Sequence, residues 1–399
     1  MGKNSFFSGT TVFGQLIDLL NPGLVTGIAK NLGSDRYCKG FRTYDHLVSM
    51  LFACFAYCTS LREIEGAFAS MHGKTKNSGV GFLPRRSTLS DANKRRSSQV
   101  FELIYKALYN HYREFITDSQ LRSSQGKSIY LLDSTTISLF QAILENAGRK
   151  PKSGKAKGGV KVHTLLKLEE QVPMMVWMSK ASAHDAPYLS KFDYEAGSIY
   201  LFDRGYVDYQ AYDRITKSEA FFVSRLKENA NYELIEEHEA VGKGIKGDLR
   251  VKFNRTVKGK VFTNQEYRII EVEDEKTQKS IKLLTNIKDL KADQVGDLYR
   301  KRWQIEMLFK QIKQNYPLKY FLGDTPNAIE IQIWVALIAN LLITVMKTAI
   351  TRSIAHSNIT TFIRINLLAY IKLADMLNHQ QTKNKTKERP SQLSLFRSG

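Results

Sequence analysis

The sequence predicts an α/β protein with a helical N-terminal region, a central part of short strands and helices, and further helices towards the C-terminus. Three observations predict it. Residues 11–120 show helical spacing of apolar positions, residues 128–287 contain short β-branched and apolar runs between turn residues, and residues 326–380 are again apolar with helical spacing. A chain of 399 residues suffices for two or three domains with an ample core.

The charge balance is strongly basic. The chain has 59 Lys and Arg residues against 39 Asp and Glu residues, a formal net charge of +20 at pH 7. Such an excess favours a polyanionic partner that is bound with release of counterions. A basic ribosomal or membrane-surface protein would have the same total, so charge alone names no partner.

Other bulk features predict a cytoplasmic protein without a membrane segment. Cys38, Cys54 and Cys58 match no zinc-site spacing and are expected to be reduced. The N-terminus shows no signal-peptide pattern. The most apolar run, residues 333–346, is too short to span a bilayer and is expected to form a buried helix.

The N-terminal helical region contains a basic segment, residues 84–96, with five basic residues and one acidic residue. Ser87 or Thr88 is expected to cap a helix through Arg96, which would expose Arg95. This pattern is similar to helical modules that place a short helix in a DNA groove. The alternative is a solvated basic face.

Two aspartates are expected at the ends of apolar strands. Asp133 interrupts the β-branched run 128–139, where a lone carboxylate is costly unless it is paired or binds a metal. The alternative for Asp133 is a turn cap, since Ser134 and Thr135 follow it. Asp203 ends the apolar run 198–202, and Gly205 permits a sharp exit turn.

A glycine-bearing basic loop, residues 149–161, lies between these aspartates and holds six cations and no acid. It is expected to fold onto a phosphate backbone, with Lys155, Lys157 and Lys161 as candidate DNA contacts; a solvated loop is the alternative. Residues 159–169 and 172–179 are expected to form a hairpin containing His163, either packed in the strand or touching phosphate. Asp185 is interpreted as a structural helix cap.

Residues 297–313 contain no proline or glycine and are predicted to form one continuous helix. At about 100° per residue, Tyr299, Arg302, Glu306 and Lys313 fall within an arc of roughly 60°. One face would thus carry an aromatic hydroxyl, two cations and a carboxylate. The alternative is an ordinary amphipathic helix with an Arg302–Glu306 ion pair at i,i+4.

The spacing Tyr-x2-Arg-x3-Glu-x6-Lys, met here by Tyr299, Arg302, Glu306 and Lys313, resembles the signature of the insertion sequence four family of bacterial DDE transposases. The resemblance implies a ribonuclease H-like catalytic core interrupted by an antiparallel β insertion. The implied regions are a helical DNA-binding domain (1–120), the core (121–229 and 288–325), the β insertion (230–287), C-terminal helices (326–380) and a basic disordered tail (381–399).

The resemblance also implies a chemistry. Asp133, Asp203 and Glu306 would be the catalytic residues and the ligands of two Mg²⁺ ions, with Mn²⁺ able to substitute, because carboxylates without a His or Cys cluster suit hard cations. Residues with implied DNA contacts are Tyr299, Arg302, Lys313, Arg95, Lys155, Lys157 and Lys161. The family's tryptophan in the insertion is absent here, so Phe253, Phe262 or Tyr267 would stack a flipped base instead.

The implied partners are double-stranded DNA, as terminal inverted repeats and as target, and a second copy of the chain in a synaptic homodimer, located at the bacterial nucleoid. Two other functions stay open. One is a metal-dependent ribonuclease H-like endonuclease without strand transfer. The other is a non-catalytic DNA-binding relic, against which the intact acids and spacing argue.

Overall fold

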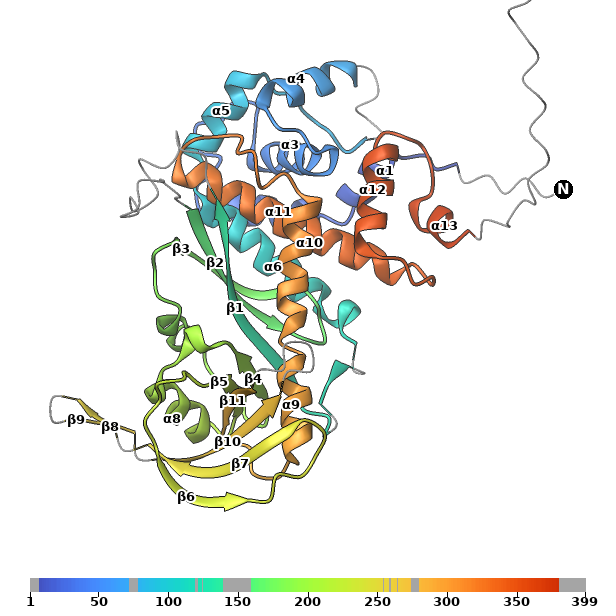
Figure 1. Cartoon of the computed structure of the whole chain (residues 1–399). Helices are drawn as coiled ribbons and strands as arrows, with labels where there is room; N and C mark the ends of the chain where they lie inside the picture. The colour runs from blue at the N-terminus through green and yellow to red at the C-terminus, as the bar shows by residue number, and fades with distance from the viewer. Residues whose placement is uncertain are drawn as a thin grey trace, which may run out of the picture.

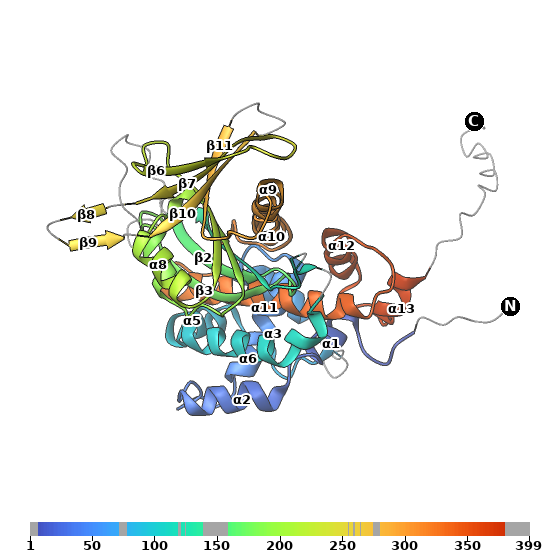
Figure 2. The same ribbon diagram turned by 90° about the horizontal axis from the view of Figure 1, so that it is seen from below.

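The computed structural model describes residues 7–71, 78–118, 121–123, 125–138, 159–253, 255–257, 260–263, 265–273 and 280–379. A nine-stranded mixed sheet runs through it. Helices from both ends of the chain gather at one end of the molecule, and the strands within residues 199–285 lie towards the other (Figure 1). Seen at 90° to that view, α9 (Ala292–Arg300) and α10 (Trp303–Asn315) lie on one face of the sheet (Figure 2).

Four of the six N-terminal helices that the structure describes, α1, α2, α4 and α6, begin at residues whose side chains accept from free backbone N–H groups. Asn21 caps α2 ahead of Pro22, and Ser60 and Ser97 cap α4 and α6. The bounds are α1 Val12–Ile17, α2 Pro22–Asn31, α3 Thr43–Ala56, α4 Leu61–Ser70, α5 Arg86–Arg95 and α6 Ser98–Ile116.

The predicted cap of α5 is wrong. Neither Ser87 nor Thr88 caps the helix, which begins at Arg86 after the extended residue Arg85 and has no side-chain cap. Pro84 fixes its own φ and favours an extended conformation for the residue before it. It places no such restriction on the residues after it, so a helix can begin at Arg86.

The sheet has the strand order β3-β2-β1-β4-β5-β11-β10-β7-β6. Strands β1, β2 and β3 pair antiparallel, whereas β4 pairs parallel with both β1 and β5. The bounds are β1 Ile129–Ser138, β2 Gly159–Lys167, β3 Pro173–Lys180, β4 Ile199–Phe202, β5 Phe221–Arg225, β6 Glu233–His238, β7 Ile245–Lys252, β10 Glu266–Glu273 and β11 Ser280–Thr285. Between β3 and β5 lie the 3₁₀ helices η3 Ala186–Ser190 and η4 Arg204–Tyr206 and the helix α8 Tyr209–Lys217.

The strands of residues 230–287 are antiparallel, as the sequence predicted. They do not form a separate sheet, because β11 pairs with β5 and so extends the central sheet. A two-stranded ribbon, β8 Arg255–Val257 and β9 Lys260–Thr263, projects from this region (Figure 1).

The predicted continuous helix over residues 297–313 is wrong. The structure has two helices, α9 Ala292–Arg300 and α10 Trp303–Asn315, joined by a turn at Lys301 and Arg302. Backbone bonds there span three residues, as from Arg302 N–H to the Tyr299 carbonyl at 3.0 Å, so the turn is tighter than an α-helix. Helix α9 packs on β5, β7 and β10, whereas α10 packs on β1 and the C-terminal helices, and the turn lets each follow its own surface.

The C-terminal helices are α11 Pro326–Thr348, α12 His356–Asn366 and α13 Leu373–Asn378. With 23 residues and a mean hydropathy of 2.0, α11 is long and apolar enough to cross a membrane, so the expectation that this segment is too short was wrong. Of its most apolar window, 83% is buried inside the protein against helices such as α6 and α3. Burial, rather than length, identifies α11 as a core helix.

Apolar side chains cover both faces of the sheet. Alternate residues of a strand point to opposite faces, and Leu131 accordingly joins the cluster under α10 and α11 whereas Leu132 joins the cluster around α8. Strand β4 lies between β1 and β5, and all four of its residues are buried. The middle of the sheet is therefore packed on both faces. Asp203 directly follows this packed strand.

We expect Leu201→Ala in β4 to lower the free energy of unfolding by about 2–5 kcal/mol, since the leucine is fully buried and the cavity would be only partly refilled. Leu234→Ala, at a leucine that is 52% exposed in β6, is the matched control and should change it by less than about 0.5 kcal/mol. Urea unfolding of both variants measures the difference. An equal decrease in the free energy of unfolding of the two variants would contradict the burial of Leu201 in the sheet.

Candidate active site

The pairing of β1 with β4 brings two aspartates together. Leu132 lies opposite Phe202 in the parallel register, so Asp133 and Asp203 are the next residues on neighbouring strands. Leu131 and Leu201 belong to the cluster beneath α10, and by the strand alternation the two aspartates face the same side. The backbone of Asp203 is still extended before η4 begins. Residues 70 positions apart (203 − 133) thereby become neighbours.

Helix α10 adds a third carboxylate to this place. Glu306 lies in its first turn, and the guanidinium of Arg302 joins it to β1: Nη2 lies 2.6 Å from Glu306 Oε1 and Nη1 lies 3.1 Å from Asp133 Oδ2. The predicted Arg302–Glu306 ion pair is thus present, and it extends to the strand. The Arg302 and Asp133 side chains are only 15% and 17% exposed, which strengthens their attraction.

Two other residues of the spacing pattern surround this cluster. The buried Tyr299 ring lies beside the Arg302 guanidinium, whose Cζ is 5.6 Å from the ring centroid. Burial raises the pKa of Tyr299 to about 12, so its hydroxyl stays protonated at neutral pH. Lys313 donates from Nζ to the Thr136 carbonyl of β1 at 2.8 Å, and burial lowers its pKa.

The acids leave the site short of positive charge. Burial is the main cause that raises the pKa of Asp133 to about 6; Asp203 and Glu306 raise it further, whereas the Ser134 N–H and Arg302 oppose the rise. Arg302 therefore pairs with two of the three carboxylates, Asp133 and Glu306. Such oxygen donors fit a hard divalent cation.

The side chains do not, however, form a finished metal site. Among the residues that the structure describes, no three His, Cys, Asp or Glu side chains are grouped so that they could hold a metal ion. The Arg302 guanidinium, a cation itself, joins Asp133 to Glu306 in this arrangement. The donor set thus fits a divalent cation in charge and chemistry, but not yet in geometry.

The remaining predicted DNA contacts are placed differently. Lys155 and Lys157 lie outside the described residues. Lys161 is only 13% exposed; its Nζ donates to the Ala183 carbonyl at 2.7 Å and pairs with Asp185 at 3.2 Å. Arg95 is 72% exposed and pairs with Asp91 of its own helix.

Three aromatic or imidazole side chains considered for DNA contact are core residues. His163 is fully buried, stacks on Tyr188 with ring centroids 3.5 Å apart, and has a pKa lowered to about 4, mainly by burial. Phe253 and Tyr267 are 1% and 2% exposed, so the expectation that either stacks a flipped base is wrong. The side chain of Phe262 lies outside the described residues.

Asp185 was interpreted as a helix cap, and that interpretation is wrong. The following element is the short 3₁₀ helix η3, and the Asp185 side chain makes no cap bond. Its carboxylate instead accepts from Ser134 Oγ at 2.8 Å and pairs with Lys161. The local sequence misleads here, because an aspartate two residues before a proline is typical of a helix cap.

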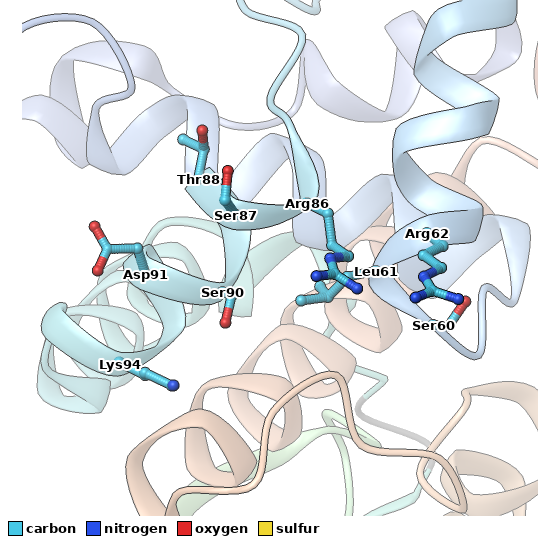
Figure 3. Close-up of a pocket in the computed structure, with 9 residues that line it drawn as sticks. All are labelled: Ser60, Leu61, Arg62, Arg86, Ser87, Thr88, Ser90, Asp91 and Lys94. Carbon is cyan, nitrogen blue, oxygen red and sulfur yellow. The ribbon is translucent and has the colours of Figure 1, made fainter.

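A charged groove of about 940 Å³ lies between the N-terminal turn of α4 and the length of α5 (Figure 3). Arg62 of α4 and Arg86 of α5 line it, with Lys94 further along α5. Within the described part of the chain, no acidic side chain forms an ion pair with any of these three cations. The lining residues are Ser60, Leu61, Arg62, Arg86, Ser87, Thr88, Ser90, Asp91 and Lys94.

Comparison with known protein families gives two matches along the chain. The family model described as transposase DDE domain matches residues 124–342, which is more than half of the chain and includes Asp133, Asp203 and Glu306. A domain of unknown function (DUF4372) matches residues 8–81.

Individual relatives agree with the first match. A candidate transposase, y4zB of Sinorhizobium fredii, is 30% identical over 261 residues, covering 64% of this chain and 70% of the relative. A candidate transposase for the insertion sequence element IS4SA of Synechocystis is 28% identical over 263 residues with the same coverage. A solved piggyBac transposase synaptic complex with hairpin DNA covers 92% of this chain and 82% of its own, at 10% identity and a TM-score of 0.43, too low to establish a shared fold.

Because the pKa of Asp133 is raised, the free energy of unfolding of the protein should depend on pH through this residue. The folded value of about 6 exceeds the ordinary 3.8, so the favourable contribution of Asp133 is present below pH 4 and is lost as pH rises through 6. In a chelator, Asp133→Asn should therefore be more stable than the wild type by about 3 kcal/mol at pH 8, with the gap closing towards pH 4. Urea unfolding across this range measures it, with the exposed Asp324→Asn as control. A gap independent of pH would contradict the prediction.

Proposed function

This chain belongs to the family of DDE transposases, and we propose that it cuts DNA at the terminal inverted repeats of an insertion sequence and joins the 3′-OH ends to target DNA. The observation that carries the proposal is the pairing of β1 with β4, which makes Asp133 and Asp203 neighbours, together with the Arg302 guanidinium that joins Asp133 to Glu306 of α10. We further propose that β1–β5, with α10 across β1, form a ribonuclease H-like core. The antiparallel hairpins and the two parallel strands that follow support it.

In this proposal the three acids hold two Mg²⁺ ions, or Mn²⁺ in their place. When bound, such ions polarise the scissile phosphate and stabilise the oxygens that attack and leave. Arg302 keeps Asp133 and Glu306 together and offers its planar donors to a DNA phosphate. Lys313 is held at the edge of β1 to contact the next phosphate, and Tyr299 supports Arg302 from below.

The proposed reaction has two displacements at phosphorus. Water first attacks the phosphorus at the element end; the bond to the 3′ oxygen breaks, and the products are a 3′-OH and a 5′-phosphate. The freed 3′-OH then attacks a target phosphorus, its proton leaves, and the displaced target 3′ oxygen takes up a proton. Both steps are in-line transfers at one site, so one set of carboxylates serves both.

The groove between α4 and α5 is the proposed contact for the phosphate backbone of the repeat. Arg62, Arg86 and Lys94 are exposed, and Arg95 lies beside them on α5. Such contacts hold a duplex in register without reading its sequence. The proposed assembly is a homodimer that pairs two ends in the bacterial nucleoid.

The first test uses purified protein, Mg²⁺ and a labelled duplex that carries the element's own terminal repeat. The wild type should nick at the repeat boundary and give joined products. Asp203→Asn should bind the duplex equally well but give no product, because it removes one ionised ligand and leaves the basic surface intact. Nicking without joined products would favour an endonuclease without strand transfer. Duplex binding without nicking would favour a non-catalytic DNA-binding relic.

The groove is tested by the salt dependence of binding to the same duplex. The triple variant carries Arg62→Ala, Arg86→Ala and Lys94→Ala. The plot of log K for duplex binding against log salt has a negative slope, and this slope should become shallower by up to about 3, since each lost phosphate contact removes roughly 0.9. Fluorescence anisotropy at several salt concentrations measures the slope. Lys30→Ala, at an exposed lysine of α2, is the control. An unchanged slope in the triple variant would exclude the groove as a backbone contact.

A further inference from the structure

Asp185 lies at the centre of a mostly buried polar cluster beside the acids. Its Oδ1 accepts from Ser134 Oγ at 2.8 Å, lies 3.2 Å from Lys161 Nζ, and lies 3.4 Å from His163 Nδ1. The Lys161 and Asp185 side chains are 13% and 21% exposed. These contacts come from two strands, β1 and β2, and meet at one carboxylate.

The cluster lies on the face of the sheet opposite to the three acids. Ser134 pairs with His163 in the register of β1 and β2, and directly opposed residues share a face. Leu132, two residues before Ser134, belongs to the cluster around α8, whereas Asp133 points to Arg302 under α10. Asp185 therefore contacts the middle of β1 from one face of the sheet, while Asp133 projects from the other face.

The same carboxylate also touches the turn that follows Asp203. A Cβ placed on Gly205 would lie 3.3 Å from Asp185 Oδ2, so the backbone passes directly against this side chain. On the β1 side, the Ser134 N–H donates to Asp133 Oδ1 at 2.7 Å. Asp185 thus contacts Ser134, the residue after Asp133, and lies against Gly205, two residues after Asp203.

The ion pair of Asp185 makes this arrangement stiff. Lys161 is held by the Ala183 carbonyl at 2.7 Å as well as by Asp185, and β2 ties it to β1 along the whole hairpin. Removing one partner of a pair this buried leaves the other charge uncompensated, which is strongly unfavourable. The cluster therefore resists displacement of either strand end.

We infer that Asp185 is a positioning residue: by fixing Ser134 and the Gly205 turn from the rear face, it keeps the Asp133 and Asp203 carboxylates side by side for divalent-ion binding. The inference rests on the proposed function for its metal. Residues that orient metal ligands typically change metal affinity or activity by about 10–100-fold when they are replaced.

The test measures Mn²⁺ binding directly, from the electron paramagnetic resonance signal of free Mn²⁺ in titrations of the purified full chain. Asp185→Asn and Ser134→Ala should each weaken binding by about 10-fold or more, and in nicking assays they should raise the half-saturating Mg²⁺ concentration in parallel. Asp193→Asn, at an exposed aspartate of the same connection, is the matched control and should behave as the wild type. Binding of the end duplex in chelator should be unchanged in all three.

The double variant Ser134→Ala/Asp185→Asn separates positioning from general damage. If both residues act through one contact, its loss of Mn²⁺ affinity should equal that of the weaker-binding single variant and not the product of both losses. Misfolding would lower the number of sites and the duplex binding but leave the affinity of the remaining sites unchanged. Wild-type Mn²⁺ affinity in Asp185→Asn, or multiplied losses in the double variant, would overturn the inference. If the wild type binds Mn²⁺ but does not nick DNA, the proposed function is contradicted, whereas the Mn²⁺-binding test of Asp185 remains valid.

Discussion

The parallel pairing of β1 with β4 is the constraint on which the rest of the site depends. With Leu132 opposite Phe202, the first two acids must be neighbours wherever the strands form. A parallel pair needs a long connection between its strands, and β2, β3 and η3 supply it here. That connection is also what brings Asp185 behind the strand ends, so the crossover positions a residue as well as closing the sheet.

Charge sets the second constraint. Three carboxylates share one partly buried place, and Arg302 is the cation that joins two of them. Because burial and like charge raise the pKa of Asp133 to about 6, the site destabilises the fold at neutral pH. The apolar clusters on both faces of the sheet offset this cost. A site held in this condition accepts further positive charge readily, whether from a metal ion or from donors on a bound ligand.

Polar contacts at the start of α11 join the N-terminal helices to the C-terminal helices. Asn327 donates to the carbonyls of Asn93 and Arg96, at the end of α5, and accepts from the Ser98 N–H that begins α6. Glu330 accepts from the Ser98 hydroxyl as well. Helix α5, which lines the charged groove, is thus attached to the buried α11, and α11 also packs on α10, the helix that carries Glu306. The groove and the acids consequently belong to one continuous structure.

By itself the sequence determined the strand that contains Asp133, the strand that ends before Asp203, the spacing that pairs Arg302 with Glu306, and the family, because each is a short-range pattern of charge and hydrophobicity. The expectation that the first strand ends at Asp133 is wrong, since β1 continues to Ser138 along its pairing with β2. Only the tertiary structure decided where α9 ends and α10 begins, since helix propensity does not register which surfaces the two halves cover. Only the tertiary structure placed Asp185 against Ser134 of β1 and the Gly205 turn, because an acid two residues before a proline has the local pattern of a cap. Local sequence encodes propensity and period, whereas contacts between distant segments depend on how the whole chain packs.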